Sequence, residues 1–119
     1  MKKLLILFLV VAAMLVFSAC SMEEEMLITS HTDPNGNYTV CLYQVGSPQW
    51  SFGSVNAKLV LQDAQGQQID EESFGLANDG AGVFAGNMKE ITWLEDRVEI
   101  VMGESDTTKR YTYVLSYAG

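Results

Sequence analysis

After about residue 25, apolar and polar residues alternate along the chain with the period of two that is typical of β-strands. Tyr38, Val40 and Leu42 fall on one side of such a pattern, and Cys41 and Tyr43 fall on the other. No stretch in this region keeps a 3.6-residue period over ten or more residues. The alternation predicts seven strands, over residues 26–32, 37–45, 54–62, 67–76, 87–94, 97–102 and 108–117.

Turn-forming residues separate the predicted strands. Residues 33–36 are Asp-Pro-Asn-Gly, in which proline fixes φ and Asn-Gly accommodates positive φ. Residues 63–66 are Asp-Ala-Gln-Gly and join two alternating segments, which predicts a β-hairpin. Residues 78–82 are expected to form a flexible link. Strands of this number and spacing predict an all-β fold, either an antiparallel β-sandwich or a curled sheet of about six or seven strands.

The first twenty residues have a different pattern, which predicts an N-terminal signal helix. Lys2 and Lys3 precede an unbroken apolar run over residues 4–17. About fourteen residues suit the apolar region of a signal peptide and fall short of the roughly 20 that a membrane-spanning helix needs. Residues 17–20, Phe-Ser-Ala-Cys, resemble the bacterial lipobox, whose cysteine thiol takes a diacylglyceryl group as a thioether.

The lipobox resemblance implies that residues 1–19 are removed and that Cys20 becomes the lipidated first residue, with acyl chains such as palmitate. The alternative is an ordinary secretory signal cut near Ala19. Because two acyl chains give stable anchoring, we expect the extracytoplasmic face of the cell membrane, or an outer membrane in a Gram-negative cell. The chain then divides into a signal peptide (1–19), a lipidated cysteine with an acidic tether (20–25) and a β-rich extracytoplasmic domain (26–119).

Acidic residues dominate the charge: 15 Asp and Glu face 7 Lys and Arg, for a net charge of −8. The signal peptide holds two of the basic residues and none of the acids, so the remaining 100 residues carry about −10. This charge argues against binding to nucleic acid. Lipidation of Cys20 leaves Cys41 without an intramolecular partner. Its apolar neighbours predict a buried thiol that serves as a small hydrophobe.

Three further segments resemble small Firmicutes lipoproteins and membrane-attached domains with a β-rich fold. Residues 34–38 match a Pro-Asn-Gly-x-Tyr turn, residues 46–53 match a Gly-x-Pro-x-Trp-x-Phe-Gly loop, and residues 93–98 match a Trp-x-x-Asp-x-Val hairpin. Ser51 stands where those proteins usually have proline. The resemblance covers most of residues 33–101 and implies a β fold and a location at the cell surface, without a particular activity.

Few residue patterns suit catalysis. His31 is the single histidine and lies at the end of the first predicted strand, where a surface position is expected. Residues 70–72 and 95–96 are consecutive acids, and adjacent side chains on a strand point to opposite faces. We therefore predict neither enzyme activity nor a cofactor. A hydrolase that uses carboxylates is the least supported alternative.

One segment has part of the pattern of a calcium-binding loop. Asp33, Asn35 and Asn37 have the oxygen spacing of a calcium loop. However, Gly36 occupies the fourth position instead of the sixth, and Gln44 replaces the glutamate of the twelfth. A hairpin turn explains the same residues, so no metal site is predicted and calcium is a minor alternative.

Trp50, Phe52 and Tyr43 are the candidate ligand- or partner-binding residues. Trp50 and Phe52 lie two positions apart and share a face in an extended segment. Exposed aromatic residues stack on sugars or anchor protein partners, and the alternative is that both fill one end of the core. The leading hypothesis is a non-catalytic binding or interaction module with a protein or glycan partner. The alternative is an accessory or structural subunit of an envelope complex.

Overall fold

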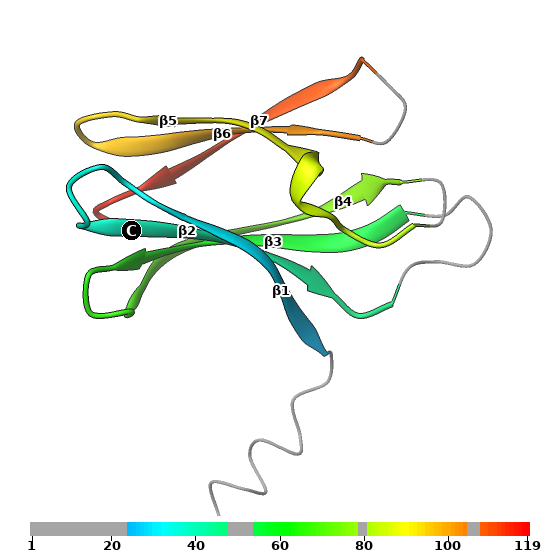
Figure 1. Cartoon of the computed structure of the whole chain (residues 1–119), viewed down its shortest axis with the longest axis horizontal. Helices are drawn as coiled ribbons and strands as arrows, with labels where there is room; N and C mark the ends of the chain where they lie inside the picture. Colours follow the sequence, from blue (N-terminus) through cyan, green and yellow to red (C-terminus); the bar gives the residue numbers. More distant parts are fainter. Residues whose placement is uncertain (1–23, 48–53, 79–80, 105–107) are drawn as a thin grey trace, which may run out of the picture.

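Seven strands form two antiparallel sheets in the computed structural model of the chain, which describes residues 24–47, 54–78, 81–104 and 108–119 (Figure 1). The first sheet contains, in spatial order, β1 (Glu25–Thr32), β2 (Tyr38–Val45), β3 (Ser54–Asp63) and β4 (Gln68–Ala77). The second contains β5 (Met88–Trp93), β6 (Arg97–Gly103) and β7 (Arg110–Ser116), and a 3₁₀ turn, η1 (Ala85–Asn87), precedes it. The predicted strands are confirmed, with small differences at their ends. The predicted signal helix and Cys20 lie outside the described residues.

The core fills the space between the two sheets, as in a β-sandwich. Its buried residues come from both sheets, so each sheet supplies one apolar face to the other. Alternate residues of β2, β3 and β6 belong to the core between the sheets, which confirms the predicted faces. The fully or nearly fully buried apolar residues of this cluster are Val40, Leu42, Val55, Ala57, Leu59, Leu61, Leu76, Val83, Val98, Ile100, Met102 and Leu115.

A register shift in β5 explains an irregular part of the sequence pattern. Met88 and Ile91 are three positions apart, so a regular strand would direct them to opposite faces. The pairing of β5 with β6 shifts between Met88 and Glu90, which adds one residue to β5. Both apolar side chains therefore pack against the same core, as Trp93 does.

Two turns of matching design close the hairpins of the first sheet. In each, a glycine with positive φ (Gly36, 74°; Gly66, 80°) donates its N–H to the carbonyl oxygen of the aspartate three residues earlier. Asp33 Oδ1 also accepts bonds from the N–H groups of Asn37 (2.7 Å) and Tyr38 (2.9 Å). Asp63 Oδ1 does the same for two N–H groups of its own turn. These aspartates fix the turns through local side-chain to backbone bonds.

The connection from the first sheet to the second differs from the flexible link expected over residues 78–82. Asn78 is fully buried, and its side-chain amide donates to the carbonyl oxygen of Gly82 (3.1 Å) and to Asn87 Oδ1 (2.9 Å). Asn87 is buried as well and donates to the carbonyl oxygen of Gly103 (2.9 Å). The prediction is wrong at Asn78 because its polar side chain is satisfied by the Gly82 carbonyl oxygen and by the buried side chain of Asn87.

Among the described residues, no helix has the length and apolar character that a membrane crossing would require.

Candidate functional site

The two ends of the sandwich differ in what they carry. Register pairs Tyr38 with Asp63, so the β1–β2 and β3–β4 turns lie at one end, which we call the turn end. The β5–β6 turn and the C-terminal residues lie at the same end, at the left of Figure 1. Glu25, the first residue of β1, pairs with Val45 at the opposite end. Eight strand residues at about 3.3 Å each separate the two ends by roughly 26 Å.

A pocket of about 340 Å³ opens at the turn end. The β1–β2 turn forms one wall, the β5–β6 turn forms another, and the residue after β7 completes it. Three aromatic residues, Tyr38, Trp93 and Tyr117, line the pocket, and each also packs against the core. Aromatic side chains in a concave site beside a few polar groups are typical of small-ligand pockets.

The aromatic side chains are held firmly in place. The rings of Tyr38 and Tyr117 stack with 4.1 Å between centroids and 5° between planes. The Tyr117 hydroxyl donates a 2.8 Å bond to the carbonyl oxygen of Leu94. This bond ties the C-terminal segment to the β5–β6 turn. The pocket is therefore assembled by tertiary contacts that fix its geometry before any ligand arrives.

Polar groups on the pocket rim give it a negative charge. Asp33 and Glu95 contribute carboxylates, and Asn35 and Asn37 contribute carboxamides. None of the described residues that line the pocket is a lysine, an arginine or a histidine. Such a rim offers hydrogen-bond acceptors and negative charge to a ligand.

The electrostatics of Tyr117 reflect the same environment. The pKa of its phenol is raised, first by desolvation and then by the negative charge of Asp33 and by Tyr38 and Asp96. The aromatic floor of the pocket thus lies in a negative potential.

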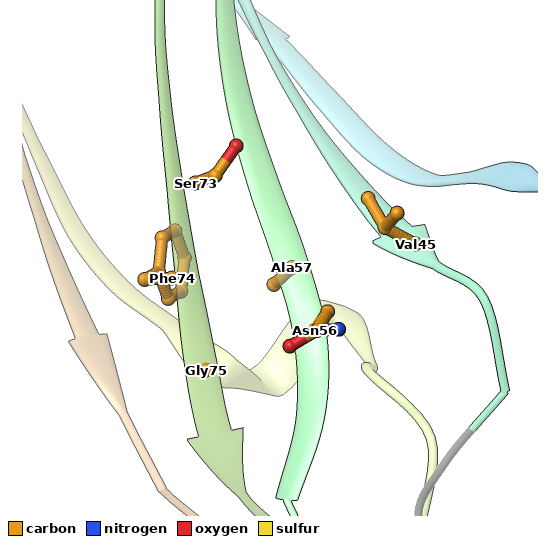
Figure 2. A pocket seen from close by; sticks show the side chains of 6 residues that line it. All are labelled: Val45, Asn56, Ala57, Ser73, Phe74 and Gly75. Carbon is orange, nitrogen blue, oxygen red and sulfur yellow. The ribbon is translucent and has the colours of Figure 1, made fainter. Parts of the chain in front are cut away.

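A second hollow, of about 370 Å³, lies near the opposite end, where β2 ends and β3 begins (Figure 2). Val45, Asn56, Ala57, Ser73, Phe74 and Gly75 line it. Small side chains create this hollow, and its polar groups are one amide and one hydroxyl. It therefore offers a ligand less charge and fewer directional contacts than the pocket at the turn end.

The predicted recognition residues are only partly placed. Trp50 and Phe52 lie outside the described residues, so their role stays a prediction. Tyr43 lies on the outward face of the first sheet, where the ammonium group of Lys58 sits 5.6 Å from the centroid of its ring. Lys58 also pairs with Glu25 and, at 3.8 Å, with Glu71. Tyr43 thus belongs to a charge-paired surface that is separate from the turn-end pocket.

Cys41 is buried, but on the outward face of the sheet and not between the sheets. Register places it beside Ser30 and Val60, and Val60 is nearly fully buried there. Burial raises the pKa of the thiol, and the hydrogen bond with Tyr43 lowers it to a smaller extent. This environment is that of a packed thiol with little thiolate character.

The remaining candidates have separate positions. His31 is exposed on β1, near Met88 and Ile91 of β5. Asp70 accepts bonds from the backbone N–H groups of Glu71 and Ser116, both at 2.9 Å, and so links β4 to the end of β7. Asp33, from the calcium alternative, has its turn-fixing role. The described residues contain no cluster of three or more His, Cys, Asp or Glu side chains suited to a metal ion.

Comparisons with family profiles, with curated proteins and with solved structures give no match for this chain. The resemblance to Firmicutes lipoproteins therefore stays a prediction.

Sequence reasoning missed the turn-end pocket, although it recognised the turn that forms one wall. Trp93 and Tyr117 are distant from Asp33 in the sequence, and each also fits the alternation of a core strand. The one local signal is the set of polar side chains at residues 33–37, which a turn explains equally well.

Proposed function

We propose that the chain is a non-catalytic binding module, anchored through lipidated Cys20 at the extracytoplasmic face of a membrane, that takes a ligand in the turn-end pocket. The observation that carries the proposal is the convergence of Tyr38, Trp93 and Tyr117 with the carboxylates of Asp33 and Glu95. A preformed pocket with this mixture of aromatic and polar groups suits a small ligand, or one residue of a larger glycan or peptide.

The position of the pocket supports this proposal. The chain enters β1 at Glu25, five residues after Cys20 and at the end of the sandwich opposite the pocket. An anchor at Cys20 would therefore hold the start of β1 close to the membrane and place the pocket at the end of the domain that is distant from it. A ligand in the extracytoplasmic space could then reach it without competing with the bilayer.

A non-catalytic role is supported by the engagement of the acidic residues. Asp70 is occupied by backbone N–H groups, Glu71 lies 3.8 Å from Lys58, and Asp96 pairs with Arg97 at 2.8 Å. These contacts give Asp70, Glu71 and Asp96 structural or surface roles, whereas general acid–base catalysis needs a carboxyl group positioned against a substrate.

The binding proposal can be tested with a blocking variant and a matched control. Asn35 and Gln65 occupy the same position in the two Asp-x-x-Gly turns, and only Asn35 lines the pocket. We expect ligand-observed saturation-transfer NMR, with a panel of amines, saccharides and short peptides, to detect binding to the full chain in polyoxyethylene-ether micelles. Asn35→Trp should abolish that signal and Gln65→Trp should retain it. The proposal fails if Asn35→Trp does not reduce the binding of any member of the panel.

The anchor can be tested separately. Cys20→Ser should prevent labelling of the protein with a clickable palmitate analogue and should release it from membranes or leave the precursor uncleaved, because the serine hydroxyl cannot form the thioether. Normal processing and membrane retention of Cys20→Ser would contradict a lipid anchor.

A second candidate function, an accessory subunit of an envelope complex, is favoured by a different observation. β1 is an edge strand of the first sheet, and Met26 and Leu27 are each 53% exposed at its start. An exposed edge can accept a strand from a partner. Crosslinking in cells should then join β1 to one defined protein, and isolation as an uncrosslinked monomer would contradict this candidate.

A further inference from the structure

We infer that the turn-end pocket selects an organic cation, a quaternary or protonated amine that carries methyl or methylene groups. This inference rests on the proposed function, since it names the chemical class of ligand for the same pocket. It joins two features of the lining, the fixed aromatic rings and the unbalanced acidic charge.

The acidic charge of the pocket is available to a ligand. None of the ion pairs that the structure gives for its described residues includes Asp33 or Glu95, whereas the neighbouring Asp96 pairs with Arg97. Asp33 Oδ1 accepts two backbone bonds, so the carboxylate is oriented by the turn and needs no cation to hold it. Its second oxygen, Oδ2, makes no hydrogen bond within the described part of the chain.

The aromatic residues complement such a ligand. The faces and edges of tyrosine and tryptophan rings contact methyl groups, and the negative potential of a ring face attracts a cation. The stacking of Tyr38 on Tyr117 and the hydroxyl bond of Tyr117 to Leu94 keep these rings from rearranging. Aromatic rings beside carboxylates thus meet both parts of an alkylammonium group, its apolar surface and its charge.

A neutral sugar is the competing ligand class, because carboxylates and carboxamides also bind hydroxyl groups. A sugar gives back no positive charge to the two carboxylates, which the described lining leaves without a basic neighbour. Electrostatic complementarity therefore favours the amine.

The test compares ligands of equal shape and different charge. Choline and its neutral isostere 3,3-dimethylbutan-1-ol differ chiefly in the charged nitrogen. We expect a titration of the full chain in polyoxyethylene-ether micelles to give a saturable response to choline and at least about a tenfold weaker one to the isostere. Nα-acetyl-lysine N-methylamide is a third probe. Its affinity relative to that of choline tells whether the pocket prefers a small quaternary ammonium ion or the basic side chain of a peptide.

The turns provide an internal reporter. The backbone amides of Asn37 and Tyr38 donate to Asp33, and those of Gln65 and Gln67 donate to Asp63 in the other turn. Only Asp33 lines the pocket. Choline should therefore shift the NMR resonances of the Asn37 and Tyr38 amides and leave those of Gln65 and Gln67 in place.

Charge variants complete the test. Glu95→Gln should weaken choline binding about fivefold, while Glu90→Gln, on an exposed strand position outside this pocket, should leave it unchanged. The inference is overturned if the isostere binds as tightly as choline, if Glu95→Gln has no effect, or if neither cationic probe binds. A saccharide that binds in an Asn35-dependent manner while choline does not would overturn the cation and leave the proposed binding function intact.

Discussion

Asn78 and Asn87 each donate a side-chain hydrogen bond to the other, at 2.9 and 3.1 Å, in the buried connection between the two sheets. Asn78 directly follows β4, and Asn87 directly precedes β5. Asn87 also accepts a bond from the Phe84 N–H and donates one to the Gly103 carbonyl oxygen, both at 2.9 Å. The pair therefore fixes the place where the chain passes from one layer to the other.

We expect Asn87→Ala to lower the free energy of unfolding by about 3 kcal/mol, because it leaves several buried polar groups without partners. Chemical denaturation measures the change. Asn56→Ala, at an exposed strand position, is the control and should change stability by less than about 0.5 kcal/mol. Equal effects of the two substitutions would show that the buried pair does not stabilise the crossing.

Two glycine substitutions should differ in their effect on stability. A Cβ at Gly82 would lie 2.5 Å from Gln44 Oε1, which accepts a bond from the Val83 N–H at 2.9 Å. Gly82→Ala should therefore displace Gln44 and cost about 1–2 kcal/mol.

A Cβ at Gly75 would meet only Ser54 Oγ, at 4.0 Å. Because alanine loses less backbone entropy on folding, Gly75→Ala should be neutral or stabilising by up to about 1 kcal/mol. Thermal melting of both variants tests the contrast, which fails if Gly82→Ala melts at or above the wild-type temperature.

The ionisation of Tyr113 should make the stability of the fold depend on pH in the alkaline range. Its pKa is raised, first by desolvation and then by Glu72 and Tyr111. The unfolded state ionises first, at about pH 10, so this contribution to stability is complete below that pH and is lost as the pH rises through the folded pKa.

Tyr113→Phe removes the ionisation and keeps a ring to stack on Phe74, which lies 4.2 Å from Tyr113 between centroids. We expect the variant to lose less stability than the wild type between about pH 10 and 11.5, as followed by urea denaturation. An identical loss in the two proteins would mean that Tyr113 does not contribute to the pH dependence.

Cys41 should react slowly with alkylating reagents. Its thiol is buried and its pKa is raised, so both access and thiolate concentration are low. In a Cys20→Ser background, in which Cys41 is the sole thiol, iodoacetamide at pH 8 should modify the folded protein at least about tenfold more slowly than the urea-unfolded protein. Similar rates in both states would contradict the burial of Cys41.

The sequence by itself determined the strands and their inward faces. A period of two directs alternate side chains to one face, so Val40 and Leu42 could be assigned to the core without knowledge of their partners. The turns could also be predicted from the sequence, because Asp33 and Gly36 form hydrogen bonds with backbone groups within a few residues. Both signals depend on local geometry.

Only the tertiary structure decided which side chains meet. Asn78 is buried because Asn87 satisfies its polar atoms, and Tyr117 joins Tyr38 and Trp93 because the two sheets stack with their turn ends together. Alternation identifies which side chains of a strand face the core, but not which element packs against them. A polar residue in the sequence likewise does not indicate which buried group it will bond to. The turn-end pocket and the polar crossing therefore depend on how the layers pack, which local periodicity does not encode.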